Sequence, residues 1–260
     1  MIHGAFDDDA FPLVVAHRGA SSTHPENTLP AFAAAIDLGA LVIELDVRLT
    51  ADGHPVVLHD PDLARTAGSG GLVHELPLER VRAANVGTGD RPAVVPLLAE
   101  VLELASGRAG VAIEIKNLPG DPGFVADREP SVAAALAELD RLAFEGPVLV
   151  LSFNPRSIAT ARESATGVLT GFLVTDAVAP DDGLAFAVAE GHDFLLPGAR
   201  GLLRSGLEVV GRAHDAGLRL GTWTVDDART FADLLDVGLD AIATNDPAMG
   251  LSVAAEHRAA

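Results

Sequence analysis

Side chains suited to acid–base or metal chemistry recur where short apolar runs of this 260-residue chain end. Six residues hold such a position: His17, Arg18, Glu44, Asp46, Glu114 and Lys116. Residues two apart on a strand project from the same face, so Glu44 and Asp46 point one way, as do Glu114 and Lys116. If the runs are parallel strands of a barrel, the sequence predicts that these groups converge at one rim.

Three of these residues, Glu44, Asp46 and Glu114, are carboxylates that would repel one another at one rim. Polar groups that point into a barrel are costly unless they are paired or bind a metal, and a hard divalent cation relieves the repulsion. All-oxygen ligands favour Mg²⁺ or Ca²⁺, with Mn²⁺ as a third candidate, and speak against zinc or copper. Lys116, the only lysine of the chain, either belongs to this site or is a structural ion-pair partner of Glu114.

A predicted β-hairpin brings a second histidine to the same cluster. Two apolar arms flank Asp52 and Gly53, a pair typical of a two-residue turn. With that turn, Asp46 lies opposite His59 on one face, and their Cβ atoms are roughly 5 Å apart. A three-residue loop would shift the register by one and turn His59 away.

The apolar runs alternate with helical stretches along the chain. The runs span residues 13–16, 41–47, 111–115, 148–153, 169–174, 194–196, 218–225 and 241–244. The helical stretches span about 29–38, 97–105, 131–144, 155–164, 181–190, 203–216, 226–236 and 247–256. Runs without polar alternation are typical of parallel strands buried on both faces, and this rhythm predicts a (β/α)8 TIM barrel. A doubly wound open sheet is the alternative, but no glycine-rich phosphate loop follows the first run.

One segment interrupts the alternation. Residues from about 48 to 96, the hairpin and a polar, glycine-rich stretch, are interpreted as a small insertion after the second strand. The whole chain, residues 1–260, is predicted to form a single barrel domain, which its length allows.

The composition limits the classes of function. Hydrophobic residues make up 48% and charged residues 21%, as in globular proteins, and the absence of cysteine excludes disulfides and thiolate metal sites. A net charge of −19 argues against nucleic acid and anionic membranes, which select a basic face, so an anionic substrate would depend on a bound cation. No run is long enough to span a bilayer and no leader is recognised, so we expect a cytoplasmic protein without a membrane anchor.

Histidines need context, because a lone histidine beside an arginine after a strand is usually a hydrogen-bonded structural residue. The hypothesis that His17 is catalytic is stronger because several independent strand ends supply the same kind of chemistry. His54 belongs to the predicted hairpin turn. The remaining histidines fall in helices, loops or tails and are interpreted as surface residues: His3, His24, His74, His192, His214 and His257.

Residues 16–60, AHRGASSTHPENTLPAFAAAIDLGALVIELDVRLTADGHPVVLHD, resemble the signature of the glycerophosphodiester phosphodiesterase family. The diagnostic triplet of that family is a His-Arg, a Glu-x-Asp and a later His. The similarity continues through Arg65-Thr66, VPLLAEVLEL, IEIK, LSF, TWTV and the closing TNDP. In this closing motif, Asn245 stands where the family usually has Asp.

The resemblance implies roles for the clustered residues. One divalent cation would be held by Glu44, Asp46 and Glu114. His17 and His59 would act as general base and general acid, respectively. Such roles suit imidazoles that titrate near neutrality.

It also implies how a small anionic phosphodiester would be bound. Arg18 and Lys116 would hold the phosphate. Trp223, at the end of the seventh strand, either lines the substrate pocket or plugs the barrel. Asn27 is expected to anchor the first loop. Glu26 either touches the site or caps the first helix, and capping is the favoured role.

These features lead to one main hypothesis and two alternatives. The main hypothesis is metal-dependent hydrolysis of glycerophosphodiesters to an alcohol and sn-glycerol 3-phosphate. A lysophospholipase D-type phosphodiesterase would use the same site but would need an apolar groove, for which the sequence offers no aromatic-rich loop. A non-catalytic phosphate-binding barrel is disfavoured because both histidines and all three carboxylates are present. The alcohol, the metal and the oligomeric state are left open.

Overall fold

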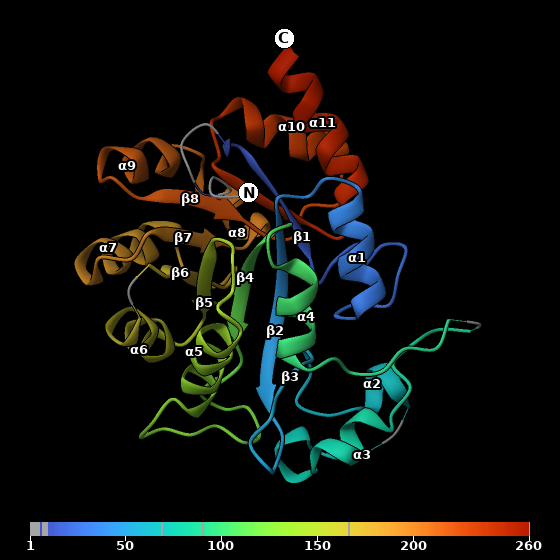
Figure 1. The fold of residues 1–260 in the computed structure, drawn as a ribbon. Coiled ribbons are helices and arrows are strands. Elements are labelled where there is room, and N and C mark those ends of the chain that lie inside the picture. Colours follow the sequence, from blue (N-terminus) through green and yellow to red (C-terminus); the bar gives the residue numbers. More distant parts are fainter. Residues whose placement is uncertain (1–5, 7–9, 69, 90, 166, 260) are drawn as a thin grey trace.

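Eight parallel strands close into a barrel surrounded by helices in the computed structural model, which describes residues 6, 10–68, 70–89, 91–165 and 167–259 (Figure 1). The strands are β1 (Leu13–His17), β2 (Val42–Leu49), β4 (Gly110–Ile115), β5 (Val148–Ser152), β6 (Leu169–Val174), β7 (Phe194–Pro197), β8 (Arg219–Thr222) and β9 (Ala241–Thr244). Each pairs with the next, and β1 pairs with both β2 and β9. The sheet is therefore closed, which confirms the predicted barrel and excludes an open sheet.

Helices cover the outside of the barrel. They are α1 (Leu29–Asp37), α4 (Leu98–Ala105), α5 (Pro130–Leu142), α6 (Pro155–Ser164), α7 (Pro180–Glu190), α8 (Ala199–Ser205), α9 (Val209–Asp215), α10 (Ala228–Asp236) and α11 (Pro247–Ala259). Side-chain caps start several of them, as where Thr28 accepts from the amide of Ala31. The single helix expected over 203–216 was wrong, because Gly206, at φ 92° and ψ 153°, separates α8 from α9. Only glycine adopts that backbone conformation readily.

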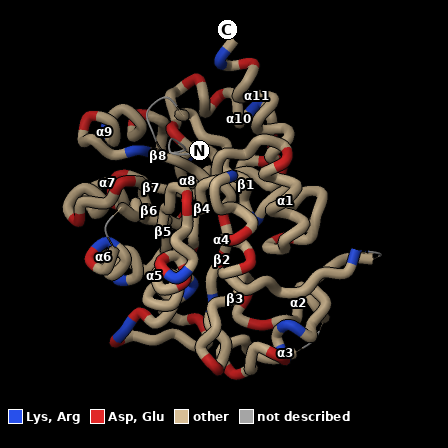
Figure 2. The backbone as a smooth tube through the Cα atoms, in the orientation of Figure 1, with Lys and Arg blue, Asp and Glu red and all other residues tan. Residues whose placement is uncertain are grey.

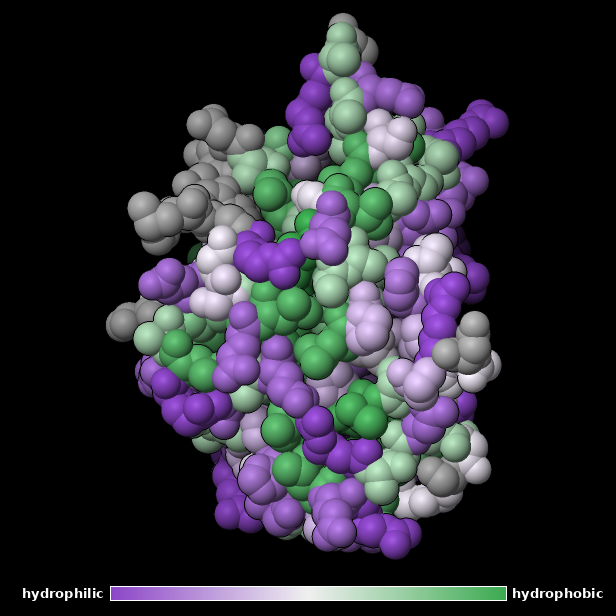
Figure 3. Space-filling model, turned by 45° about the vertical axis from the view of Figure 1, so that its right-hand side comes forward, coloured by the Kyte–Doolittle hydropathy of each residue, from purple (hydrophilic) through white to green (hydrophobic). Residues whose placement is uncertain are grey.

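Two apolar layers hold the barrel together. Outward-facing strand residues such as Ile43 and Ile113 pack with the helices, while Leu149 and Phe194 belong to a second cluster inside the barrel. Burial on both faces explains the unbroken apolar runs of the sequence. Acidic positions are scattered over the helices with basic ones between them (Figure 2). The face drawn in Figure 3 carries hydrophobic side chains along its middle and hydrophilic ones around them.

The described helices include none that is long and apolar enough to cross a membrane.

One histidine departs from the surface interpretation. His192 is buried, its Nδ1 lies 3.0 Å from the hydroxyl of Thr170, and its ring packs near Phe186. A loop between a helix and a strand can pack inward, which sequence polarity alone did not reveal. His3 lies outside the described residues.

The predicted insertion forms a small unit beside the barrel, with α2 and α3 at the bottom right of Figure 1. It contains β3 (Pro55–Val57), antiparallel to β2, then α2 (Ala64–Ala67), the 3-10 helix η2 (Val73–Glu75) and α3 (Leu78–Arg82). A separate apolar cluster, which includes Val56, Leu58 and Val81, gives this unit its own small core.

The predicted register of the hairpin was wrong by one residue. Arg48 pairs with Val56, so the loop has three residues, 51–53. The hydroxyl of Thr50 accepts from the amide of His54, and Gly53 adopts φ 84°, as is usual for three-residue hairpin loops. Asp46 therefore lies opposite Leu58, whose amide donates to the Asp46 carbonyl at 3.0 Å.

Candidate active site

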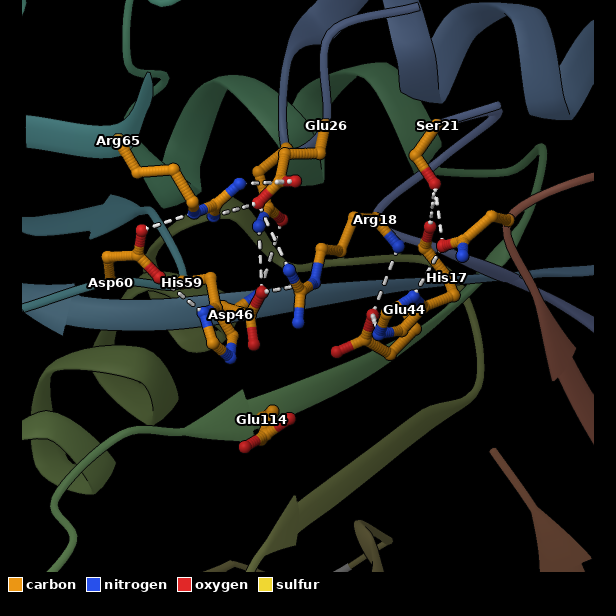
Figure 4. Close-up of polar contacts among 12 residues, drawn as sticks. His17, Arg18, Ser21, Glu26, Glu44, Asp46, His59, Asp60, Arg65 and Glu114 are labelled. Atoms are coloured by element: carbon orange, nitrogen blue, oxygen red, sulfur yellow. Dashed lines mark hydrogen bonds and ion pairs between the residues drawn. The ribbon is translucent and has the colours of Figure 1, made fainter. Parts of the chain in front are cut away.

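Three buried carboxylates meet at the carboxyl-terminal rim of the barrel. Glu44 and Asp46 stand two apart on β2, and Asp46 is in register with Glu114 on β4. One oxygen from each lies within 4.8 Å of the others, and the residues are 5%, 0% and 6% exposed. The convergence predicted from their spacing is confirmed, and Figure 4 shows them on neighbouring strands.

Asp46 is the most heavily bonded of the three carboxylates. The Lys116 ammonium lies 3.0 Å from Asp46 Oδ1 and also donates to Glu114. Arg18 Nε lies 3.1 Å from Asp46 Oδ2, and the Asn27 amide donates to that oxygen at 2.7 Å. The left-handed conformation of Asn27, φ 56°, aims its side chain at the strand, in keeping with its expected role in the loop.

The electrostatics of the three carboxylates differ. Burial would raise the pKa of Asp46, but the charges of Lys116 and Arg18 outweigh it and lower that pKa. Burial, helped by the charge of Asp46, raises the pKa of Glu44 to about 8. Burial also raises the pKa of Glu114 to about 7, against the opposing charge of Lys116. Two carboxyls therefore hold protons near neutrality unless a further cation stabilises their charge.

The donor set fits a hard divalent cation. Glu44 Oε1 is buried and accepts no hydrogen bond from any described residue, so this oxygen is available to bind a cation. Glu44 Oε2 accepts only a backbone amide, that of Arg18, at 3.0 Å. Carboxylate oxygens are the ligands of Mg²⁺, Ca²⁺ and Mn²⁺, and the cation would offset the charge that burial penalises.

His17 points its Nε2 into the cluster. Asn245 Nδ2 donates to Asp226 at 2.7 Å, so its Oδ1 faces His17 Nδ1, also at 2.7 Å. Ser21 donates to the same Oδ1 at 2.9 Å. An amide oxygen accepts, which assigns the proton to Nδ1 and leaves Nε2, 4.0 Å from Glu44 Oε2, free to take a proton. Burial and the nearby Arg18 lower the pKa of His17, which favours this neutral form.

His59 reaches the cluster in spite of the shifted register. It lies beyond β3, where strand alternation no longer dictates its direction, and Arg48 Nε donates to its carbonyl at 2.8 Å. Its Nδ1 lies 2.7 Å from Asp60 Oδ1, and Arg65 Nε donates to the other Asp60 oxygen at 2.5 Å. Burial and Lys116 lower the pKa of His59, whereas Asp60 raises it. A carboxylate partner stabilises imidazolium more than an amide does.

Glu26 joins the two sides of the site, as Figure 4 shows. It accepts from Arg18 at 3.0 Å and from both terminal nitrogens of Arg65, so Asp60, Arg65, Glu26 and Arg18 form one chain of ion pairs. Of the two roles expected for Glu26, the favoured one as helix cap was wrong, because Thr28 caps α1, and contact with the site is the one that its position fits. Asp60 and Asn245 were not predicted as partners of the histidines. The only signals were that Asp60 directly follows His59 and that Asn245 departs from the usual motif.

A cavity of about 200 Å³ opens between the carboxylates and the opposite wall of the barrel. His17, Arg18, His59 and Lys116 line it together with Trp223. The Trp223 indole donates to the Leu196 carbonyl at 2.9 Å, and its ring packs edge-on against Phe153 at 5.4 Å. Of the two expectations for Trp223, lining the pocket is the one that this position fits.

The chain is similar to known phosphodiesterases over most of its length. The model of the family described as "Glycerophosphoryl diester phosphodiesterase family" matches residues 17–249. A glycerophosphodiester phosphodiesterase from Caldanaerobacter subterraneus is 34% identical over 249 residues, which covers 90% of this chain and 94% of that protein.

The chain is also similar to solved structures of phosphodiesterases. The glycerophosphodiester phosphodiesterase from Agrobacterium tumefaciens matches with a TM-score of 0.76 at 27% identity, over 94% of this chain and 99% of that one. An Oleispira antarctica phosphodiesterase in complex with its product sn-glycerol-3-phosphate matches with a TM-score of 0.83 at 25% identity, over 95% of this chain and 98% of that one.

Proposed function

The chain belongs to the glycerophosphoryl diester phosphodiesterase family, a family of hydrolases, and we propose that it hydrolyses glycerophosphodiesters to an alcohol and sn-glycerol 3-phosphate. The observation that carries the proposal is the convergence of Glu44, Asp46 and Glu114 beside two histidines with different partners. The product bound to the Oleispira antarctica phosphodiesterase supports the same reaction.

We propose that one divalent cation, Mg²⁺, Ca²⁺ or Mn²⁺, is held by Glu44, Asp46 and Glu114. When bound, it would neutralise charge on the non-bridging phosphate oxygens. The raised pKa values of Glu44 and Glu114 support this, because a cation would replace the protons that these carboxyls otherwise keep.

Arg18 and Lys116 are the proposed phosphate-binding residues. Both line the cavity, and both are fixed by ion pairs to Asp46. Preorganised cations stabilise charge that develops on a phosphoryl group without having to reorient during the reaction. Their ion pairs therefore serve to hold them in place.

The two histidines are proposed to divide the proton transfers. His17 Nε2, with its proton on Nδ1 held by Asn245, takes the proton from the attacking nucleophile. His59, whose Nδ1 is bonded to the Asp60 carboxylate, gives a proton to the departing alkoxide. An alkoxide is a poor leaving group, so its protonation is expected to matter most for unactivated alcohols.

A panel assay tests the function. Purified protein with Mg²⁺ is incubated with glycerophosphocholine, glycerophosphoethanolamine or glycerophosphoglycerol, and glycerol 3-phosphate is measured by a coupled enzyme. We expect glycerol 3-phosphate from at least one glycerophosphodiester, at a rate roughly 10²–10⁴ lower for the His17→Ala variant. Release from none of them, by a folded protein that holds the metal, would refute the proposal.

A single domain over residues 1–260 and a cytoplasmic location stay proposals that rest on the sequence. So does a small anionic phosphodiester as the substrate.

A further inference from the structure

The cavity that holds the catalytic groups continues into an apolar chamber. Its polar wall comes from β1, β2 and β4, with Glu44 and Glu114 at the mouth. Beyond them, the lining changes to apolar side chains. These come from β5 to β9 and from the parts of β1, β2 and β4 that precede the catalytic residues. Among these are Val42, Leu149, Phe194 and Leu196. We call this apolar part the lumen.

The lumen has little capacity to bind hydroxyl groups. Thr222 and Trp223 are the only described lining residues outside the catalytic group that carry a polar side-chain atom. The Thr222 hydroxyl donates to the Pro197 carbonyl at 2.8 Å, and the Trp223 indole donates to the Leu196 carbonyl at 2.9 Å. A glycerol or sugar in the lumen would lose hydrogen bonds to water without replacing them.

Small residues keep the lumen open. The interior of a (β/α)8 barrel is normally filled by layers of bulky branched side chains. Here, alanines face the cavity at Ala112 on β4 and at Ala241 and Ala243 on β9. Apolar cavities of this kind stay dry and bind apolar molecules, so the lumen has the chemistry of an aliphatic subsite.

We infer that the lumen binds an unbranched alkyl chain attached to the phosphodiester that the catalytic groups hold. The inference rests on the proposed function and names its substrate class: glycerophosphodiesters that carry an aliphatic chain. The whole cavity, catalytic mouth included, holds about 200 Å³, so at about 30 Å³ for each water-sized group the lumen takes a chain of at most about six carbons. The chain can be carried on the leaving alcohol or on the glycerol, and the two sources are separable by assay.

Trp223 supplies a binding assay that does not depend on turnover, because it is the only tryptophan of the chain and lines the cavity. Its fluorescence is followed while the Mg²⁺-loaded protein is titrated with ethyl, butyl, hexyl, octyl and dodecyl phosphate. Burial of each methylene should lower Kd about fourfold, until the lumen is full at no more than about six carbons. A Kd that does not change from ethyl to hexyl, or no emission change with any of them, would overturn the inference.

Two variants and a matched control locate the chain. Leu149→Ala enlarges the lumen and should move the plateau to a chain about three carbons longer, whereas Ala112→Leu fills it and should abolish the gain beyond ethyl phosphate. Val150→Ala is the control, because Val150 neighbours Leu149 on β5, is equally buried and packs outward with the helices. Because the two lumen variants change volume in opposite directions, one that fails to fold leaves the other as the test. Chain-length profiles of the lumen variants that match that of Val150→Ala would contradict the inference.

Turnover then identifies the source of the chain. Glycerophospho-n-alkanols carry it on the alcohol, and 1-O-alkyl-glycerophosphoethanol carries it on the glycerol. We expect kcat/KM to rise about fourfold per methylene in one of these series, and a flat profile in both would overturn the inference. If no phosphodiester is hydrolysed but Kd still falls with chain length, the proposed function fails while the lumen remains a binding site.

Discussion

Replacement of Asp60 by asparagine separates positioning of His59 from the rest of the site. Asp60 accepts from His59 Nδ1 at 2.7 Å and is itself held by Arg65. A hydrogen bond to a charged partner contributes about 1.5–3 kcal/mol, so its loss predicts a fall in kcat of about 10–100-fold. A substrate with a nitrophenyl leaving group needs little protonation, and its kcat should fall much less.

The pH profile supplies a second readout. Burial and Lys116 lower the pKa of His59, and Asp60 opposes them. Without the carboxylate the pKa of His59 falls further, and the high-pH limb of kcat, which reports the general acid, should move to lower pH. Asp62→Asn is the matched control, because Asp62 lies in the same loop and, among the residues that the structure describes, its side chain accepts only from the Ala64 amide, at 2.8 Å. Equal losses for both substrates, with an unmoved high-pH limb, would refute the role of His59 as acid.

Three further predictions address the cluster itself. His17→Ala and His59→Ala should each lower steady-state turnover by roughly 10²–10⁴. A substrate with an activated leaving group should restore turnover only to His59→Ala, and restored turnover of His17→Ala instead would reverse the two roles. Lys116→Met should lower the free energy of unfolding, measured in urea at pH 8, by about 3–5 kcal/mol, because it leaves buried carboxylates without their cation. The loss should be smaller at pH 5, where Glu114 is protonated. Cation-free protein should lose thermal stability as pH rises from 7 to 9, above the range in which unfolded histidines titrate, because the pKa of Glu44 is raised from 4.5 to about 8 and that of Glu114 from 4.5 to about 7. Over this range the folded state binds more protons than the unfolded state at these two groups, so their contribution to stability, full below about pH 4.5, is lost as pH rises through 7 and 8, and Mg²⁺ should restore more stability at pH 8 than at pH 5. A flat melting temperature across this range would contradict that reasoning.

The sequence predicted the barrel and the convergence of the site because both follow from strand geometry. Side chains two apart share a face, and parallel strands end at one rim, so Glu44, Asp46 and Glu114 were expected to meet. Neither inference needs a rotamer or a loop conformation.

The hairpin and Glu26 show where such reasoning stops. Asp52-Gly53 suits both two- and three-residue loops, and the Thr50 side chain helped to select the longer one. His59 still reaches the site because it lies past the end of β3, where the register no longer sets the direction of its side chain. Capping was the favoured role for Glu26, but its carboxylate instead accepts from Arg18 and from Arg65, which is 39 positions away.

The partners of the histidines were out of reach for a related reason. Asn245 is brought to His17 by the closure of β9 on β1, a contact across 228 positions. Its orientation is set by Asp226, which no spacing pattern connects to it. The lumen likewise depends on the sum of many side-chain volumes and not on any motif.

Metal dependence of glycerol 3-phosphate release tests the central claim most directly. Purified protein is treated with EDTA, dialysed exhaustively and assayed on glycerophosphodiesters before and after Mg²⁺, Ca²⁺ or Mn²⁺ is added. The three carboxylates predict that chelation removes the activity and that at least one of these cations restores it in the wild type but not in Glu114→Gln. Full activity in the chelated protein, or full restoration in Glu114→Gln, would contradict the account.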